Sequence, residues 1–178
     1  MAMLFLFLVF PVVVSSSTSE AQKQNVTNIQ FYMHDVVGGS NPTAVRVASR
    51  SANVTGLESS DPIAAMFGST FVMDNPLTVT PDPNSTLIGR AQGIYAMASQ
   101  KDEFSLLMTL TYGFTTGQYN GSSFSVIGRN PVMRKVREMP IVGGTGIFRF
   151  ARGYCSAQTH STSGMDAVIG YNVTILMH

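Results

Sequence analysis

The sequence predicts an all-β protein folded as a barrel, and three features support this fold class. Apolar and polar side chains alternate along most of the chain, as they do in strands with one buried face. Clusters of Gly, Pro, Asn, Asp and Ser separate the alternating segments and indicate turns. No long segment has the periodicity of an amphipathic helix. We therefore expect a single β domain over residues 22–178.

Nine segments have the composition of strands, and each ends where turn-forming residues begin. In chain order they are residues 29–37, 44–48, 66–73, 87–98, 104–114, 122–129, 136–142, 147–159 and 167–176. Eight or nine strands at this spacing favour a sandwich or a barrel. A closed barrel is preferred because the long segment 147–159 would otherwise leave an edge free to pair with other chains.

Individual segments refine this expectation. The first strand places Ile29, Phe31 and Met33 on one face, which ends in Asp35. The Ser- and Asn-rich residues 49–64 predict a long loop that covers or ties the barrel mouth. In residues 89–95 small residues alternate with large ones, which lets a strand bend or a ligand approach closely.

The composition limits the class of partner. Of the 178 residues, 44% are hydrophobic and only 12% are charged, with 11 Lys and Arg against 10 Asp and Glu. Nucleic-acid binding needs a basic surface, which this near-neutral balance does not provide. Low charge and apolar residues on both faces of several strands favour an oligomer over a monomer.

The N-terminal residues predict a secretory signal peptide. Residues 1–14 are apolar and residues 15–19 are small and polar, the layout of a hydrophobic region followed by a cleavage zone. A membrane anchor is the alternative, but the apolar run is shorter than the roughly 20 residues that span a bilayer. We expect residues 1–21 to be the leader of an extracellular protein that is not held in a membrane.

Secretion also fits five Asn-X-Ser/Thr sequons, which begin at Asn25, Asn53, Asn84, Asn120 and Asn172. The expected glycosylation sites are Asn53, Asn84 and Asn120, and the last two lie in turn-like sequence. The single cysteine, Cys155, excludes an internal disulfide, and we expect a buried, unreactive thiol.

The run from Val136 to Tyr154 (VREMPIVGGTGIFRFARGY) places arginines among aromatic residues in a charge-poor chain and indicates a site wall. Arg137, Met139 and Ile141 share one strand face. Two interpretations are open. The arginines lie on a solvated sheet face, or they line a cavity whose aromatic walls hold a flat, oxygen-bearing ligand. The glycines at 143–146 favour a tight turn over a phosphate-binding loop, because strand-like residues follow them.

Asp35 is a candidate acid because it ends an apolar strand face. Burial would raise the pKa of its carboxyl group, unless a nearby arginine holds it ionised. The alternative is a strand-end aspartate that accepts hydrogen bonds from the turn at 36–39. Tyr95 is a second candidate, because the small residues before it leave space to be filled. The three histidines lack metal-ligand spacing, and with one cysteine we expect no metal site and no cofactor.

From residue 28 to the C terminus the chain resembles the plant dirigent proteins. The resemblance rests on residues 31–35 (FYMHD), 89–95 (GRAQGIY), 119–122 (YNGS) and 142–146 (VGGTG). It implies an eight-stranded antiparallel β-barrel, assembled as a homotrimer, glycosylated and secreted to the plant apoplast or cell wall. Dirigent proteins bind phenolic intermediates of lignan and phenolic secondary metabolism and impose stereochemistry on otherwise unselective reactions. In the lignan-forming type an oxidase, a laccase or a peroxidase, supplies coniferyl alcohol radicals, and the barrel has no redox centre.

The resemblance also implies residue roles. Asp35 matches an acidic cavity residue, Arg137 a cavity arginine and Tyr95 a cavity tyrosine that binds substrate. Lignan-forming members carry a second cavity aspartate seven residues before the arginine, where this chain has Asn130. The sequence motifs at residues 128–131 (GRNP) and 137–140 (REMP) look more like those of the dirigent branch that includes pterocarpan synthases. Pterocarpan synthases eliminate water from an isoflavanol through a quinone methide.

Three functions stay open at this point. In the first, the barrel orients a phenoxy radical or a quinone methide, either as a stereodirecting auxiliary protein or as a hydro-lyase of the pterocarpan synthase type. Asp35 would then protonate a departing hydroxyl or a quinone methide oxygen, and Arg137 would stabilise phenolate charge. The second is a non-catalytic barrel that sequesters phenolics for defence. The third, cyclase chemistry of the allene oxide cyclase kind, is less supported because the motifs are dirigent ones. Arg149 and Arg152 are not assigned a role.

Overall fold

The computed structural model describes residues 25–49 and 61–177. The expected leader, Asn53 and most of the expected loop at 49–64 therefore lie outside the described residues. The strands are β1 (Asn25–Asp35), β2 (Ala44–Ala48), β3 (Thr70–Thr78), β4 (Leu87–Met97), β5 (Ser105–Phe114), β6 (Ser123–Pro131), β7 (Arg137–Thr145), β8 (Arg152–Ser163) and β9 (Asp166–Met177). The helices are α1 (Pro62–Met66) and two short 3-10 helices, η1 (Gly117–Tyr119) and η2 (Gly146–Phe148).

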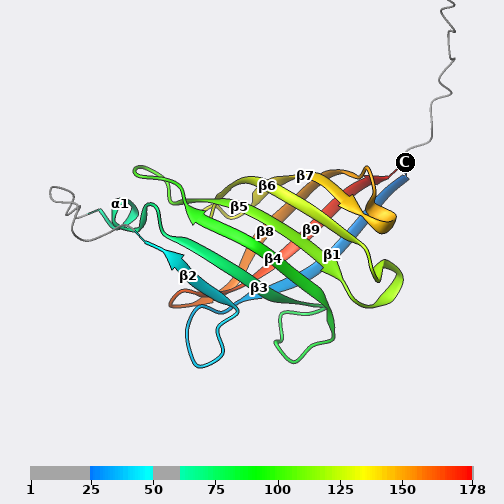
Figure 1. The fold of residues 1–178 in the computed structure, drawn as a ribbon, viewed down its shortest axis with the longest axis horizontal. Coiled ribbons are helices and arrows are strands. Elements are labelled where there is room, and N and C mark those ends of the chain that lie inside the picture. Colours follow the sequence, from blue (N-terminus) through cyan, green and yellow to red (C-terminus); the bar gives the residue numbers. More distant parts are fainter. Residues whose placement is uncertain (1–24, 50–60, 178) are drawn as a thin grey trace, which may run out of the picture.

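Eight of the described strands close into an antiparallel barrel, which confirms the predicted fold class (Figure 1). The order around the barrel is β1, β9, β8, β7, β6, β5, β4, β3, and the sheet closes where β3 pairs with β1. That closing seam is short, because only Tyr32 with Thr78 and Met33 with Leu77 are in register. The ninth strand, β2, pairs with the first half of β3. It therefore covers the part of the β3 edge that does not pair with β1.

At two places the structure has a helix where the sequence predicted a strand. The segment expected as a strand over 66–73 begins with the end of helix α1, and β3 starts only at Thr70. The Asp61 side chain accepts a hydrogen bond from the Ile63 amide at 2.9 Å, which caps a helix too short to show helical periodicity in the sequence. In the described parts of the chain, no helix is long and apolar enough to cross a membrane.

The second difference lies in the glycine-rich run. Strand β7 continues through Gly143 and Gly144, so the expected turn at 143–146 starts at Gly146, where φ is +61°. The expected strand 147–159 begins instead with η2 and becomes strand β8 only at Arg152. This detour brings Phe148 into the core and leaves Phe150 75% exposed with a φ of +61°. The prediction of a strand over residues 147–151 is therefore wrong.

The barrel interior is filled differently at its two ends. At the end that carries η1 and η2, aromatic rings pack against one another with centroids 4.9–6.1 Å apart. This aromatic cluster consists of Phe31, Tyr112, Phe114, Tyr119, Phe124 and Phe148. Such packing leaves no room for a ligand at that end. The opposite end, near α1 in Figure 1, is the open one.

Close strand packing explains the glycines of β4. A Cβ atom on Gly89 would lie 2.1 Å from the Gly113 carbonyl oxygen, and one on Gly93 would lie 2.1 Å from the Thr109 carbonyl oxygen. Both oxygens belong to β5. Of the two roles predicted for these small residues, the close approach is therefore to a neighbouring strand and not to a ligand.

Cys155 matches its prediction as a buried thiol. Its side chain is inaccessible to solvent, and burial raises the pKa of the thiol to about 12. The thiol therefore stays protonated and unreactive at neutral pH.

Candidate functional site

The open end of the barrel holds a cavity of about 360 Å³. Its walls come from the interior faces of the strands, and its mouth is framed by α1 and by the turns that join β4 to β5, β6 to β7 and β8 to β9. All four residues predicted for the site line this cavity: Asp35, Tyr95, Asn130 and Arg137. The strand pattern and the family resemblance together therefore pointed to residues of β1, β4, β6 and β7 that the fold brings to one cavity.

The apolar walls are mostly methionine, which differs from the aromatic walls expected. The methionines are Met33, Met66, Met73, Met97, Met108, Met133 and Met165. The lining also includes three aromatic side chains, from Tyr95, Phe104 and Tyr171, and the aliphatic residues Leu106, Val132, Ala167 and Ile169. Methionine is unbranched and polarisable, so these walls can adjust to a flat aromatic ligand.

Asp35 provides the acidic part of the cavity. Desolvation by burial is the largest influence on its carboxyl group and raises the pKa. A hydrogen bond from the Asn75 amide, 3.1 Å from Nδ2 to Oδ1, and an interaction with the Tyr95 hydroxyl oppose that rise, whereas the negative charge of Asp166 adds to it. The net effect of these influences is a raised pKa for a carboxyl group that lines the cavity.

The alternative role for Asp35, as the acceptor for the turn that follows β1, is not observed. The amides of Val37 and Gly38 donate to Asp166 Oδ1 at 2.8 and 2.9 Å, and the Val36 amide donates to Thr43 Oγ1 at 3.1 Å. Because other side chains satisfy this turn, the Asp35 carboxyl group is left for the cavity.

Asn75 meets Asp35 because of how the barrel closes. Along β3 the partner strand changes from β2 to β1 between Met73 and Leu77. Asn75 lies at this change and is completely buried, and its Oδ1 atom has no hydrogen-bond partner among the described residues. The amide therefore fills the gap in the ladder and points its Nδ2 group at the last residue of β1.

Arg137 provides the cationic part of the cavity. The residue is only 3% exposed, which excludes the solvated sheet face as its location. Its Nη1 atom donates to Thr159 Oγ1 at 2.7 Å, and Nε donates to Asn130 Oδ1 at 3.2 Å. Burial lowers the pKa of the guanidinium, and the neighbouring Tyr171 opposes that shift.

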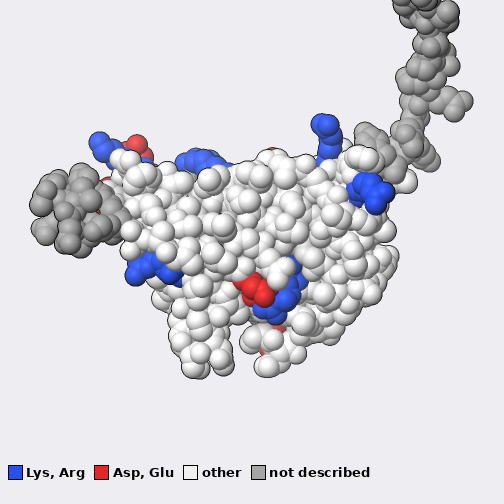
Figure 2. All heavy atoms as spheres, in the orientation of Figure 1, with Lys and Arg blue, Asp and Glu red and all other residues white. Residues whose placement is uncertain are grey.

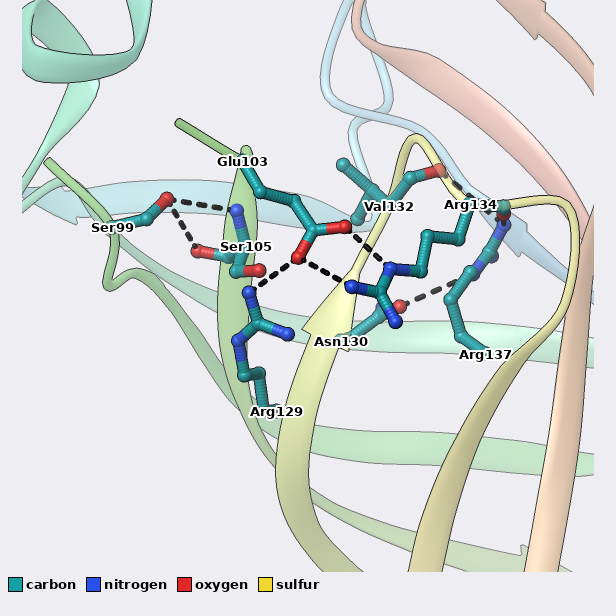
Figure 3. Close-up of polar contacts among 8 residues, drawn as sticks. All are labelled: Ser99, Glu103, Ser105, Arg129, Asn130, Val132, Arg134 and Arg137. Atoms are coloured by element: carbon teal, nitrogen blue, oxygen red, sulfur yellow. Dashed lines mark hydrogen bonds and ion pairs between the residues drawn. The ribbon is translucent and has the colours of Figure 1, made fainter. Parts of the chain in front are cut away.

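A surface ion-pair cluster holds the rim beside Arg137 (Figure 3). Glu103 accepts hydrogen bonds from both Arg129 and Arg134, and these bonds lower the pKa of its carboxyl group. Arg134 lies in the turn between β6 and β7, whose carbonyl groups at Val132 and Arg134 face Arg137 Nη1 at 3.5 Å. The cluster thereby ties the β4–β5 turn to the turn that surrounds the guanidinium.

The acid and the cation of the cavity are not paired with each other. Across residues 25–49 and 61–177, no ion pair involves Asp35 or Arg137. Arg137 has only neutral hydrogen-bond partners, and its Nη2 atom has none among the described residues. One cavity thus combines a carboxyl group whose pKa is raised by burial with a positive charge that has no counterion among the described residues.

Other sequence predictions fall elsewhere. Arg149 and Arg152 are exposed and line a hollow on the outer surface beside η2, not the cavity. Asn84 and Asn120 are exposed in turns, as expected for glycosylation sites, whose occupancy the structure does not test. Within the described ranges no group of three or more His, Cys, Asp or Glu side chains could hold a metal ion.

Two polar cavity partners were not predicted. Thr159 lies within strand β8 and gives no sequence signal beyond its position. Asn75 does give one, because it shares a strand face with Phe71, Met73 and Leu77, all of which are buried. A neutral polar residue on an otherwise apolar face indicates a buried hydrogen bond.

Comparison with known proteins agrees with this architecture. The sequence profile of the dirigent-like protein family matches residues 26–176. The chain is 45% identical to dirigent protein 23 of Arabidopsis thaliana, over 98% of this chain and 94% of that protein. It is also 45% identical to pterocarpan synthase 1 of Glycine max, over 86% of this chain and 80% of that protein. A solved structure of a pterocarpan synthase dirigent protein superposes with a TM-score of 0.77 at 40% identity, over 89% of this chain and 88% of that one.

Proposed function

This chain belongs to the dirigent family, and we propose that it binds a reactive phenolic intermediate in the barrel cavity and fixes the stereochemistry of its coupling or cyclisation. The observation that carries the proposal is a pair of unlinked groups in one cavity: the acid Asp35, whose pKa is raised by burial, and the cation Arg137, which has no counterion among the described residues. A ligand held between them and against the methionine walls exposes one face to attack.

The geometry favours cyclisation through a quinone methide. A ligand bound as a phenolate lies with its oxygen against Arg137. Asp35 donates its proton to a departing hydroxyl group, the carbon–oxygen bond breaks, and water leaves. The phenolate oxygen becomes the carbonyl group of the quinone methide. A hydroxyl group of the ligand then attacks the methide carbon, its proton returns to the Asp35 carboxylate, and the phenolate forms again.

Asn130 is the reason to favour this route over radical coupling. A carboxylate at this position would pair with Arg137 and cancel its charge, whereas the Asn130 amide oxygen orients Nε and leaves the charge in place. A phenolate then finds its counterion in the protein. The similarity to two pterocarpan synthases supports the same choice, and the substrate proposed for this chain is accordingly an isoflavanol or a related phenolic alcohol.

The proposal includes secretion of the protein and its assembly into a homotrimer. The surface of the barrel offers a candidate contact between copies. An outer band of four aliphatic residues and one threonine crosses five neighbouring strands in register: Val45, Val72, Ile94, Thr109 and Ile127. The four aliphatic members are each 41–48% exposed, and Figure 2 shows that the face over β3, β4 and β5 carries few charged side chains. Such a band is typical of a contact between copies, and we propose that it is buried in the expected homotrimer.

The test compares two reactions of the purified protein. An isoflavanol is incubated with the protein alone, and coniferyl alcohol is incubated with the protein and an oxidase; chiral chromatography measures rate and enantiomer ratio in both. Faster, enantioselective loss of water from the isoflavanol supports the proposal. Selectivity only with coniferyl alcohol would assign the chain to radical coupling. No effect in either reaction would instead support a barrel that only sequesters phenolics.

A further inference from the structure

A second hollow lies on the outside of the barrel, across the sheet from the cavity. It has a volume of about 440 Å³ and lies over β1, β9 and β8, with the chain at Val79, Thr80 and Pro81 as its side wall. We call it the amide groove. None of the described residues that line it is Lys, Arg, Asp or Glu. Its ligand must therefore be bound without ion pairs.

An aromatic ring forms the floor of the amide groove. The Tyr32 side chain lies over Gly170 of the next strand, where a Cβ atom would be only 3.2 Å from ring atom Cε1. The His160 ring meets Tyr32 edge-on, with centroids 5.8 Å apart and an interplanar angle of 80°. Because glycine provides no side chain at this position, the tyrosine ring can pack closely against strand β9.

Three amide side chains surround this ring. Gln30 pairs in register with Asn172, and Tyr32 pairs with Gly170, which in turn pairs with Gln158. The amide groups of Gln30, Gln158 and Asn172 are exposed and make no hydrogen bond with other described residues. Each can both donate and accept a hydrogen bond.

The side wall of the groove is held in place by its own hydrogen bonds. Thr78 Oγ1 donates to the Thr80 carbonyl oxygen at 2.7 Å, and the Thr80 amide donates to Ser85 Oγ at 3.1 Å. Buried His34 holds the same threonine hydroxyl through Nε2 at 2.7 Å. The wall is therefore formed before any ligand binds, which lowers the entropic cost of binding.

We infer that the amide groove binds a neutral saccharide chain. A sugar ring has an apolar face of C–H groups, which stacks on an aromatic ring, and a rim of hydroxyl groups, which exchange pairs of hydrogen bonds with amides. The groove supplies both kinds of contact and no charge. Anionic and cationic ligands, by contrast, would lose their hydration here without gaining a counterion. This inference is independent of the proposed function, because it concerns the outer face of the barrel.

Affinity electrophoresis of the secreted protein tests the inference. The gel contains hydroxyethylcellulose, a neutral polysaccharide, or polygalacturonate, an anionic one, and calorimetry with cellohexaose measures affinity. We expect retardation only in the neutral gel. Tyr32→Ala should weaken binding at least tenfold, and Gln158→Ala, which removes only an exposed amide, about threefold to tenfold.

Matched variants outside the groove serve as controls. Tyr154→Ala removes an exposed tyrosine from the same strand as Gln158, and Gln92→Ala removes an exposed amide from β4. Both should bind as the unaltered protein does. Absence of retardation in the neutral gel, equal retardation in both gels, or equal weakening by groove and control variants would overturn the inference. So would a glycan on Asn172 found by mass spectrometry, because the protein's own sugar would then fill the groove.

Discussion

Replacing Asp35 with asparagine removes a transferable proton from the cavity and keeps its shape. The Asn75 amide can still donate to the oxygen atom of the new side chain, as it does to Asp35 Oδ1 at 3.1 Å. The neighbouring Tyr95 and the methionine walls are unchanged. The variant therefore separates the loss of acid chemistry from any loss of packing.

For Asp35→Asn we expect a lower reaction rate but an equal or higher thermal stability. General acid catalysis contributes about 10²- to 10⁴-fold to rate, so Asp35→Asn should slow isoflavanol dehydration by that factor, or by roughly 3–5 kcal/mol of activation free energy. Because burial raises the pKa of Asp35 in the folded state, its contribution to stability is full below the unfolded pKa and is lost as the pH rises through the folded pKa. At neutral pH asparagine should leave thermal stability equal or higher.

The assay follows dehydration rate and product chirality by chiral chromatography, with thermal unfolding measured on the same samples. Asp102→Asn is the matched control, since Asp102 is exposed and has a φ of +65°, which asparagine tolerates. The control should change the rate less than about twofold, as expected for a surface site. An Asp35→Asn variant that keeps its rate and enantiomeric excess would refute the role of Asp35. One that loses activity only because it unfolds would refute the stability argument.

Three further predictions follow from the cavity and the outer band. Asn75→Ala removes a hydrogen bond that lowers the pKa of Asp35, so the acid should stay protonated to higher pH; the alkaline limit of the rate profile should move upward, and an unmoved limit would argue against this contact. Asn130→Asp places a carboxylate beside Arg137 and should reduce isoflavanol turnover about tenfold or more, whereas unchanged turnover would show that the free positive charge is not needed. Ile94→Lys puts a charge at the centre of the outer band and should shift the protein to monomer in size-exclusion chromatography with light scattering, while its circular dichroism stays the same; an intact oligomer would place the contact elsewhere.

Strand periodicity carried most of what the sequence could predict about the site. Asp35 and Arg137 each share a strand face with apolar neighbours, so alternation alone indicates that both point inward once a barrel closes. Alternation fails where the backbone leaves the strand conformation. Helix η2 interrupts the strand, so side chains no longer alternate between the two faces of the sheet. For this reason Phe148 is buried in the core and Phe150 is exposed on the surface.

Side-chain contacts between neighbouring strands could not be predicted in the same way. The bond from Arg137 to Thr159 joins β7 to β8 over 22 residues, and the bond from Asn75 to Asp35 spans 40. Both depend on register, which tertiary packing sets and a single sequence does not display. The methionine walls were also missed, because methionine on a strand face indicates core packing as readily as a cavity.

The closing seam between β1 and β3 has a consequence for motion. Strand β1 pairs with β9 at eleven positions but with β3 at only two, so this joint is where backbone amides should exchange with solvent most readily. Asp35 is the last residue of β1, next to that joint, and Asn75 spans it. Asp35 therefore lies beside the strand pairing of the barrel that should open at the lowest free-energy cost. Transient opening of this seam would let the cavity widen for a bulky ligand while the other seven strand pairings of the barrel stay intact.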